Sequence, residues 1–143
     1  MEPKNPAYRE RVIALIEQPP FMRSLGTQFV DARPGYCETA LTVTDAHAQQ
    51  DGYVHAGVQG ALADHTCGCA AFTLVAADEI ILTVEYKVNL LRPAVGERLR
   101  CRATVLRPGR TLMVTEADVL AERDGEERLV ARVTATMAVT AAR

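Results

Sequence analysis

Residues 58–77 form an apolar segment that needs to be covered on most of its sides when the chain folds. The stretch reads VQGALADHTCGCAAFTLVAA and predicts one long helix. A helix that is apolar nearly all round belongs in the interior of a domain. Its many small residues let a sheet approach it closely; they are Gly60, Ala61, Ala63, Gly68, Ala70 and Ala71. Three polar residues interrupt the apolar run: Asp64, His65 and Thr66. Asp64 needs an explanation most, because a carboxylate removed from water is costly unless it is paired, hydrogen-bonded or used.

Short strands are expected on both sides of this helix. Before it, residues 25–32 and 36–44 flank an Arg-Pro-Gly turn and predict a hairpin. After it, four segments separated by turns that contain glycine predict an antiparallel meander. These segments are 80–91, 97–106, 111–122 and 128–140.

A short N-terminal helix is expected in the stretch NPAYRERVIALIEQPP, which Asn5 can cap and which Pro19–Pro20 end. The chain has 143 residues, with no internal repeat and no linker, so residues 1–143 are expected to form a single domain. The fold class is α+β: an antiparallel sheet of about six strands wrapped around one long central helix, which is the hotdog architecture.

Composition excludes several classes of function. The net charge is −2 with both signs scattered, which argues against a nucleic-acid-binding surface. No apolar stretch resembles a membrane span, and the N-terminus has no signal-peptide core, so a cytoplasmic location is expected. The four cysteines form no Cys-x-x-Cys pair and the three histidines lie far apart, so free buried thiols and no metal site are expected.

Several motifs together resemble the PaaI-type acyl-CoA thioesterases of the hotdog superfamily. They are GYVHAGVQGALAD, the segment LTVEYKVNLLRPAVGERLRCRATVLRPGRTLMVTEADV and the closing ARVTATM, and the resemblance runs from about Leu25 to about Met137. It implies hydrolysis of an acyl- or aryl-CoA thioester to the free acid and CoA. It also implies that no cofactor is needed, since CoA is part of the substrate, and that the chain forms a homodimer or a dimer of dimers.

The resemblance assigns site residues one by one. The family's loop motif His-Gly-Gly corresponds to His55-Ala56-Gly57, and its catalytic acid corresponds to Asp64, nine residues after the histidine. An asparagine upstream of the motif in some members falls at Gln49. A Ser or Thr that assists the acid in some members falls at Thr83, although strict alternation puts Thr83 on the strand face that points away from the helix.

Thioester hydrolysis requires an oxyanion to be stabilised and water to be activated or replaced by a covalent nucleophile. At the start of the helix, the Gly57 N–H is expected to polarise the carbonyl, with Val58 beside it in contact with substrate. Asp64 is the candidate base or nucleophile, and both roles stay open. Seven helical residues separate Gly57 from Asp64, roughly 10 Å, which is too far for one carbonyl. The spacing therefore predicts a site shared by two chains around a two-fold axis.

Three arginines beside turns, Arg92, Arg107 and Arg110, are candidates for binding CoA phosphates. The acyl group, and the choice between dimer and tetramer, stay open. Two alternative functions also stay open: a hotdog hydratase or dehydratase of acyl thioesters, and a non-catalytic acyl-CoA-binding module.

Overall fold

The computed structural model describes residues 1–143. Two short helices, α1 (Tyr8–Glu17) and α2 (Pro20–Leu25), precede the hairpin of β1 (Gln28–Arg33) and β2 (Tyr36–Thr42). A 3-10 turn, η1 (Asp45–His47), leads to the long helix α3 (Ala56–Phe72). The remaining strands are β3 (Glu79–Leu90), β4 (Arg98–Pro108), β5 (Leu112–Arg123) and β6 (Glu126–Ala141).

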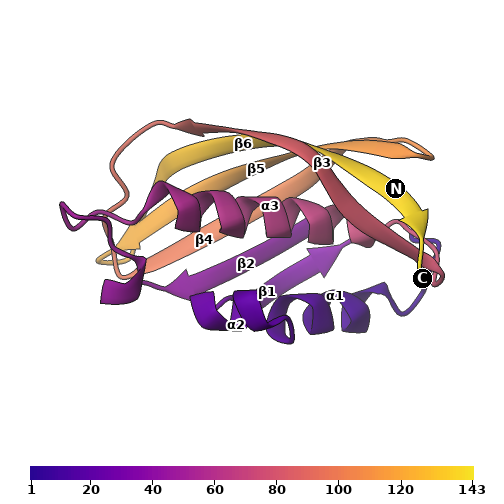
Figure 1. The fold of residues 1–143 in the computed structure, drawn as a ribbon, viewed down its shortest axis with the longest axis horizontal. Helices are drawn as coiled ribbons and strands as arrows, with labels where there is room; N and C mark the ends of the chain where they lie inside the picture. Colours follow the sequence, from indigo (N-terminus) through magenta and orange to yellow (C-terminus); the bar gives the residue numbers. More distant parts are fainter.

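The six strands form one antiparallel sheet in the order β1-β2-β4-β5-β6-β3, and α3 lies across the face around which the sheet curls (Figure 1). The hotdog fold predicted from the sequence is thereby confirmed. The core sits between α3 and the sheet, where Leu62 and Cys67 of the helix and Leu99 of β4 are fully buried. The small residues of α3 allow this close approach of helix and sheet.

The predicted four-strand meander is wrong in one connection. Only β4, β5 and β6 form a meander, whereas β3 pairs with β6 at the far side of the sheet. The seven residues 91–97 therefore cross from one side of the curled sheet to the other. Three strand spacings amount to roughly 14 Å, and seven residues reach roughly 23 Å, so a short loop is sufficient.

Helix boundaries also differ from the prediction. Pro19–Pro20 end the first helix as expected, but Pro20 then occupies the first turn of a second helix, α2, because proline suits that position. The long helix was expected over 58–77 and instead begins at Ala56, where the His55 side chain caps it. It ends at Phe72, where the Leu74 and Val75 N–H groups bond three residues back and close the last turn.

Strand β3 has a bulge between Thr83 and Glu85, with Val84 as the extra residue. A bulge places two consecutive residues opposite one partner and so reverses the alternation of side chains beyond it. Tyr86 and Val88 face α3 as predicted, because an added Cβ at Gly60 would contact both. Thr83 also faces α3, so the expectation that it points away from the helix is wrong, and the bulge is the reason.

The two edges of the sheet differ in how they are protected. Strand β1 is six residues long, has a bulge between Phe29 and Asp31, and packs against α1. Strand β3 is twelve residues long, and its large apolar side chains are among the most exposed of the protein. These are Leu82 (55%), Val84 (60%), Tyr86 (47%) and Leu90 (53%). A long exposed apolar edge is a template for pairing with another strand.

None of the helices is long and apolar enough to cross a membrane.

Candidate active site at the two ends of strand β3

The start of α3 is capped by the side chain of the residue before it. His55 Nδ1 accepts a hydrogen bond from the Gly57 N–H at 2.8 Å, and the His55 carbonyl accepts from the Val58 N–H at 3.0 Å. The Nε2 atom of the neutral ring therefore carries the proton. A Cβ at Gly57 would lie 3.0 Å from His55 Nδ1, so glycine lets the imidazole approach this closely. Ala56 lies in the first turn and has no positive φ, so the middle position of the motif needs no glycine here.

Asp64 lies in the middle of α3 and faces β3. The Thr83 hydroxyl donates a hydrogen bond of 2.8 Å to Asp64 Oδ1, so the structure brings together the two residues that the resemblance pairs. The β3 bulge makes this contact possible, since it points the threonine towards the helix. The second carboxylate oxygen makes no hydrogen bond within the chain and is free for a substrate or a water.

The Asp64–Thr83 pair borders a hollow of about 320 Å³ between α1, α3 and the start of β3. Most of the other lining residues are apolar or small: Leu15, Gly68, Cys69, Phe72, Ile80 and Ile81. His65 also lines it and hydrogen-bonds through Nε2 to the Leu15 carbonyl at 2.8 Å, which ties α1 to α3. Burial lowers the pKa of His65, so its ring is neutral near pH 7.

A second hollow of about 500 Å³ lies at the other end of β3, and its lining includes Gln49, His55 and Arg92. Gln49 holds the loop before the helix, because its Oε1 accepts from the Asp51 N–H and from the Tyr53 N–H. The Oε1 atom of Gln49 is therefore engaged by the loop.

Gln59 also lines the second hollow, and the sequence analysis missed it. Its side chain is buried, its Nε2 donates to the Val54 carbonyl at 3.2 Å, and its Oε1 has no hydrogen-bond partner. A buried acceptor without a partner is costly. The available signal was a polar residue two positions after Gly57 in an otherwise apolar helix.

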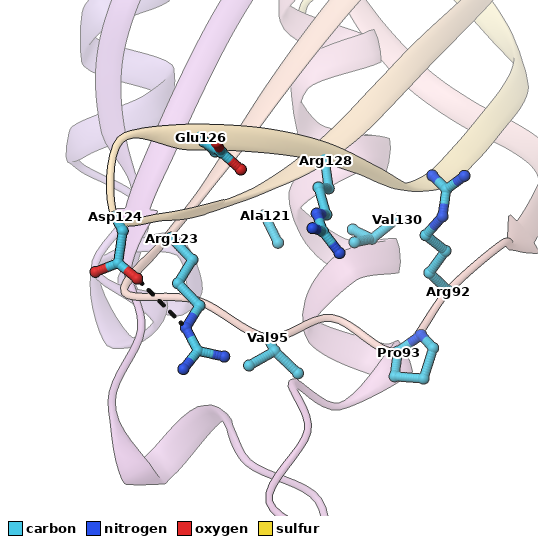
Figure 2. Close-up of a pocket in the computed structure, with 9 residues that line it drawn as sticks. All are labelled: Arg92, Pro93, Val95, Ala121, Arg123, Asp124, Glu126, Arg128 and Val130. Atoms are coloured by element: carbon cyan, nitrogen blue, oxygen red, sulfur yellow. Dashed lines mark ion pairs between the residues drawn. The ribbon is translucent and has the colours of Figure 1, made fainter.

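Arg92 joins the second hollow to a third one of about 710 Å³, shown in Figure 2. Two more arginines that were not singled out from the sequence, Arg123 and Arg128, line this third hollow. Arg128 extends into it, whereas Arg123 pairs with Asp124 at 3.8 Å (Figure 2). Arg92 itself donates to the Leu129 carbonyl at 2.8 Å, which orients its guanidinium.

The other two candidate arginines do not join this group. Arg110 lies in the β4–β5 turn and lines a separate hollow with Lys4 and Met113, and Arg107 lies near the end of β4. Strand pairing puts this turn near the start of β3, at the opposite end of the sheet from Arg92. The candidate residues of one chain thus lie at two opposite ends of the sheet.

The hollow at Asp64 and the hollow at His55 share no lining residue. Ile80, Ile81 and Thr83 of β3 border the first, and Leu90 at the end of the same strand borders the second. Gly57 and Asp64 also lie in one continuous helix, so about 10 Å of helix axis separates them. One chain by itself holds the two halves of the predicted site apart.

Residues 51–128 match the family model described as the thioesterase superfamily. This is more than half of the chain, so the chain belongs to that superfamily. Together with the fold, the match identifies a hotdog thioesterase, an enzyme that hydrolyses thioesters.

Three relatives illustrate the range of the similarity. A thioesterase family protein from Silicibacter pomeroyi is 42% identical, with a TM-score of 0.91 over 94% of this chain and 99% of that one. A 1,4-dihydroxy-2-naphthoyl-CoA hydrolase from Listeria monocytogenes is 28% identical over 81% of this chain and 92% of its own length. A mutant of the phenylacetic acid degradation protein PaaI from Thermus thermophilus is 26% identical, with a TM-score of 0.73 over 84% of this chain and 98% of that one. The resemblance to PaaI-type thioesterases is thereby confirmed.

Proposed function

We propose that the chain hydrolyses acyl-CoA thioesters as a homodimer in which each site combines the Gly57 end of one chain with Asp64 of the other. The observation that carries this proposal is the separation of the two hollows at opposite ends of β3. A reacting carbonyl has to lie within about 3 Å of both the oxyanion donor and the base or nucleophile. One chain with a straight α3 does not meet that condition.

The exposed edge of β3 supports a way for two chains to meet. If two β3 edges pair antiparallel around a two-fold axis, the start of one strand lies beside the end of the other. The Thr83 end of one chain then approaches the Leu90 end of its partner. This pairing would also cover the exposed side chains of Leu82, Val84 and Tyr86.

The chemistry assigned to this site starts from the capped helix. The substrate carbonyl oxygen takes the place of His55 Nδ1 as acceptor of the Gly57 N–H. The His55 ring turns aside, while the His55 backbone N–H keeps its hydrogen bond to the His47 carbonyl and holds the loop. The N-terminal end of α3 then stabilises the negative charge that develops on that oxygen. Asp64 either removes a proton from a water that attacks the carbonyl carbon or attacks that carbon itself, while the Thr83 hydroxyl holds its carboxylate in place. The C–S bond then breaks and CoA leaves as the thiolate, which takes up a proton. In the covalent route, water afterwards hydrolyses the anhydride formed between the acyl group and Asp64.

The CoA part of the substrate is assigned to the two hollows that meet at Arg92. The pantetheine arm would pass through the hollow beside His55, and the phosphates would reach Arg92 and Arg128 (Figure 2). Guanidinium groups bind phosphate with paired hydrogen bonds. A tetramer built from two dimers, and a cytoplasmic location, stay predictions.

The decisive experiment mixes two inactive variants. In Gly57→Val the added side chain displaces the His55 ring and blocks the donor, and Asp64→Asn keeps the shape of the acid without its charge. Each variant alone should lose at least about 10²-fold in kcat on acyl-CoA substrates. After exchange of subunits, a mixed dimer carries both defects in one site and neither in the other.

About half of a random mixture consists of mixed dimers, so roughly a quarter of wild-type activity should return. Mass spectrometry of the intact dimers verifies exchange, and circular dichroism verifies that both variants fold. If exchange is complete and no activity returns, the two residues act within one chain and the proposal is refuted. Near-normal turnover of either single variant would remove that residue from the mechanism.

A further inference from the structure

Gly68 occupies a position in α3 where glycine has no packing reason. It lies well inside the helix, four residues after Asp64 and therefore on the same face. An added Cβ would meet no heavy atom within 4 Å, and φ is not positive. Glycine in a helix interior is destabilising relative to alanine. The chain thus keeps a less stable residue at a place where a methyl group would fit.

Gly60, in the same helix, behaves differently. There an added Cβ would lie 3.7–3.8 Å from the side chains of Tyr86 and Val88, at ordinary contact distance. Helix and strand already fill the space over Gly60, whereas the space over Gly68 is open. That open space is part of the hollow beside Asp64.

The hollow has the shape and surface of a site for a small apolar group. Its volume of about 320 Å³ is at the low end of the range of small-molecule sites. Apolar side chains come from three elements: Leu15 from α1, Phe72 from α3, and Ile80 and Ile81 from β3. The Asp64–Thr83 pair lies at its border, where the reacting carbon of a substrate would be.

No cationic side chain lines this hollow. Its titratable groups are Asp64, Cys69 and His65, whose half-buried imidazole hydrogen-bonds to the Leu15 carbonyl. Arg11 stacks over the Phe72 ring at 4.5 Å but lines a neighbouring hollow instead. A second negative charge next to Asp64 would therefore be repelled and left without a partner.

We propose that this hollow holds the acyl group of the thioester, and that the missing side chain at Gly68 sets the length of the uncharged acyl chain that the enzyme accepts. This inference rests on the proposed function and adds a substrate class to it: short- to medium-length or single-ring acyl groups without a terminal carboxylate. Glycine at position 68 gives up helix stability and leaves room for the end of the acyl chain.

The test measures kcat/KM for acetyl-, butyryl-, hexanoyl-, octanoyl- and decanoyl-CoA in the wild type, Gly68→Ala and Gly68→Val. One methylene in an apolar pocket changes kcat/KM by about 10- to 200-fold. In Gly68→Val, kcat/KM for the longest acyl chain that the wild type hydrolyses well should therefore fall by about that factor, while kcat/KM for acetyl-CoA should change by no more than about twofold. Gly68→Ala should shift the profile in the same direction and raise Tm by about 3 °C.

The matched control is Gly60→Ala, which adds the same methyl group to the same helix outside the hollow. It should raise Tm similarly and leave the chain-length profile unchanged. The charge argument is tested separately by succinyl-CoA, which should be on the order of 10²-fold poorer than butyryl-CoA because of like-charge repulsion.

The outcomes separate this inference from the proposed function. If the wild type releases no CoA from any ester, both are overturned. The inference alone is overturned if the wild type is active and Gly68→Val leaves the chain-length profile unchanged. It is also overturned if Gly68→Val lowers kcat/KM by the same factor for every substrate. It is also overturned if Gly68→Ala reduces the assembled mass, because the open space would then belong to a partner chain.

Discussion

Replacing Thr83 by valine removes one hydrogen bond from Asp64 and leaves the shape of the side chain nearly unchanged. The Thr83 hydroxyl donates a hydrogen bond of 2.8 Å to Asp64 Oδ1, and its other contact, at 3.6 Å to the Met137 sulfur, is weak. Valine is also a strong strand former, so the bulge and the strand should persist. The change therefore isolates the effect of the hydroxyl on the carboxylate.

A hydrogen bond to a charged group contributes about 1.5–3 kcal/mol. The Thr83 side chain is exposed, so the low end of this range applies. About 1.5 kcal/mol corresponds to roughly a tenfold lower kcat, if the bond holds the carboxylate in its reactive orientation. KM should change little, because the hydroxyl is not expected to bind the substrate directly.

The assay is thiol release from the best acyl-CoA substrate, with Tm measured for each variant. Thr83→Ser keeps the hydroxyl and loses only a methyl group, so it should retain at least about half of the wild-type kcat. If Thr83→Val turns over normally, the hydrogen bond has no catalytic part. If Thr83→Ser is as slow as Thr83→Val, the loss comes from packing and the reasoning fails.

Three further predictions concern stability and reactivity. His55→Ala should lower the free energy of unfolding by about 1 kcal/mol in urea titrations, because the cap on the Gly57 N–H is lost, and His55→Asn should recover part of it. Burial and Glu38 raise the pKa of Tyr36 to about 12, so the folded state holds this proton more tightly and loses stability as pH rises from about 10 to 12. Unfolding titrations across that window should show a shallower decline for Tyr36→Phe, and an identical decline would contradict the assignment. Burial raises the pKa of Cys67 and Cys101, and all four thiols are inaccessible, so a thiol reagent at about pH 8 should label them only after denaturation.

The architecture could be predicted because its main signals are local. Alternating strands, an apolar helix of small residues and glycine-containing turns were sufficient for the hotdog fold. The position of β3 next to β6 was missed, because sequence neighbours usually pair and the crossover depends on how far the whole sheet curls. The second helix was missed because Pro19–Pro20 predicts the end of one helix, whereas Pro20 also occupies the first turn of the next.

The candidate site shows a similar division. The motif placed Asp64 and Gly57 on one helix, and their spacing of about 10 Å could be worked out from residue numbers alone. The partnership of Thr83 with Asp64 depended on a single bulge residue, which strict alternation does not reveal. Arg128 was missed because it becomes notable only through the hollow that surrounds it. Gln59 gave a sequence signal as a polar residue near the start of the apolar helix, but its unpartnered Oε1 could be seen only in the structure.

The pairing of β3 with β6 has a consequence for how the chain folds. Glu79 at the start of β3 lies opposite Ala141 at the end of β6, so this contact joins distant parts of the sequence. Such contacts form slowly because a long loop has to close first. During synthesis from the N-terminus, β3 emerges well before β6. Until β6 is made, β3 has no strand to pair with and several of its large apolar side chains stay uncovered. Of the six strands, the last to leave the ribosome is thus β6, which completes the sheet around α3, and the chain is most exposed to aggregation in the period before β6 emerges.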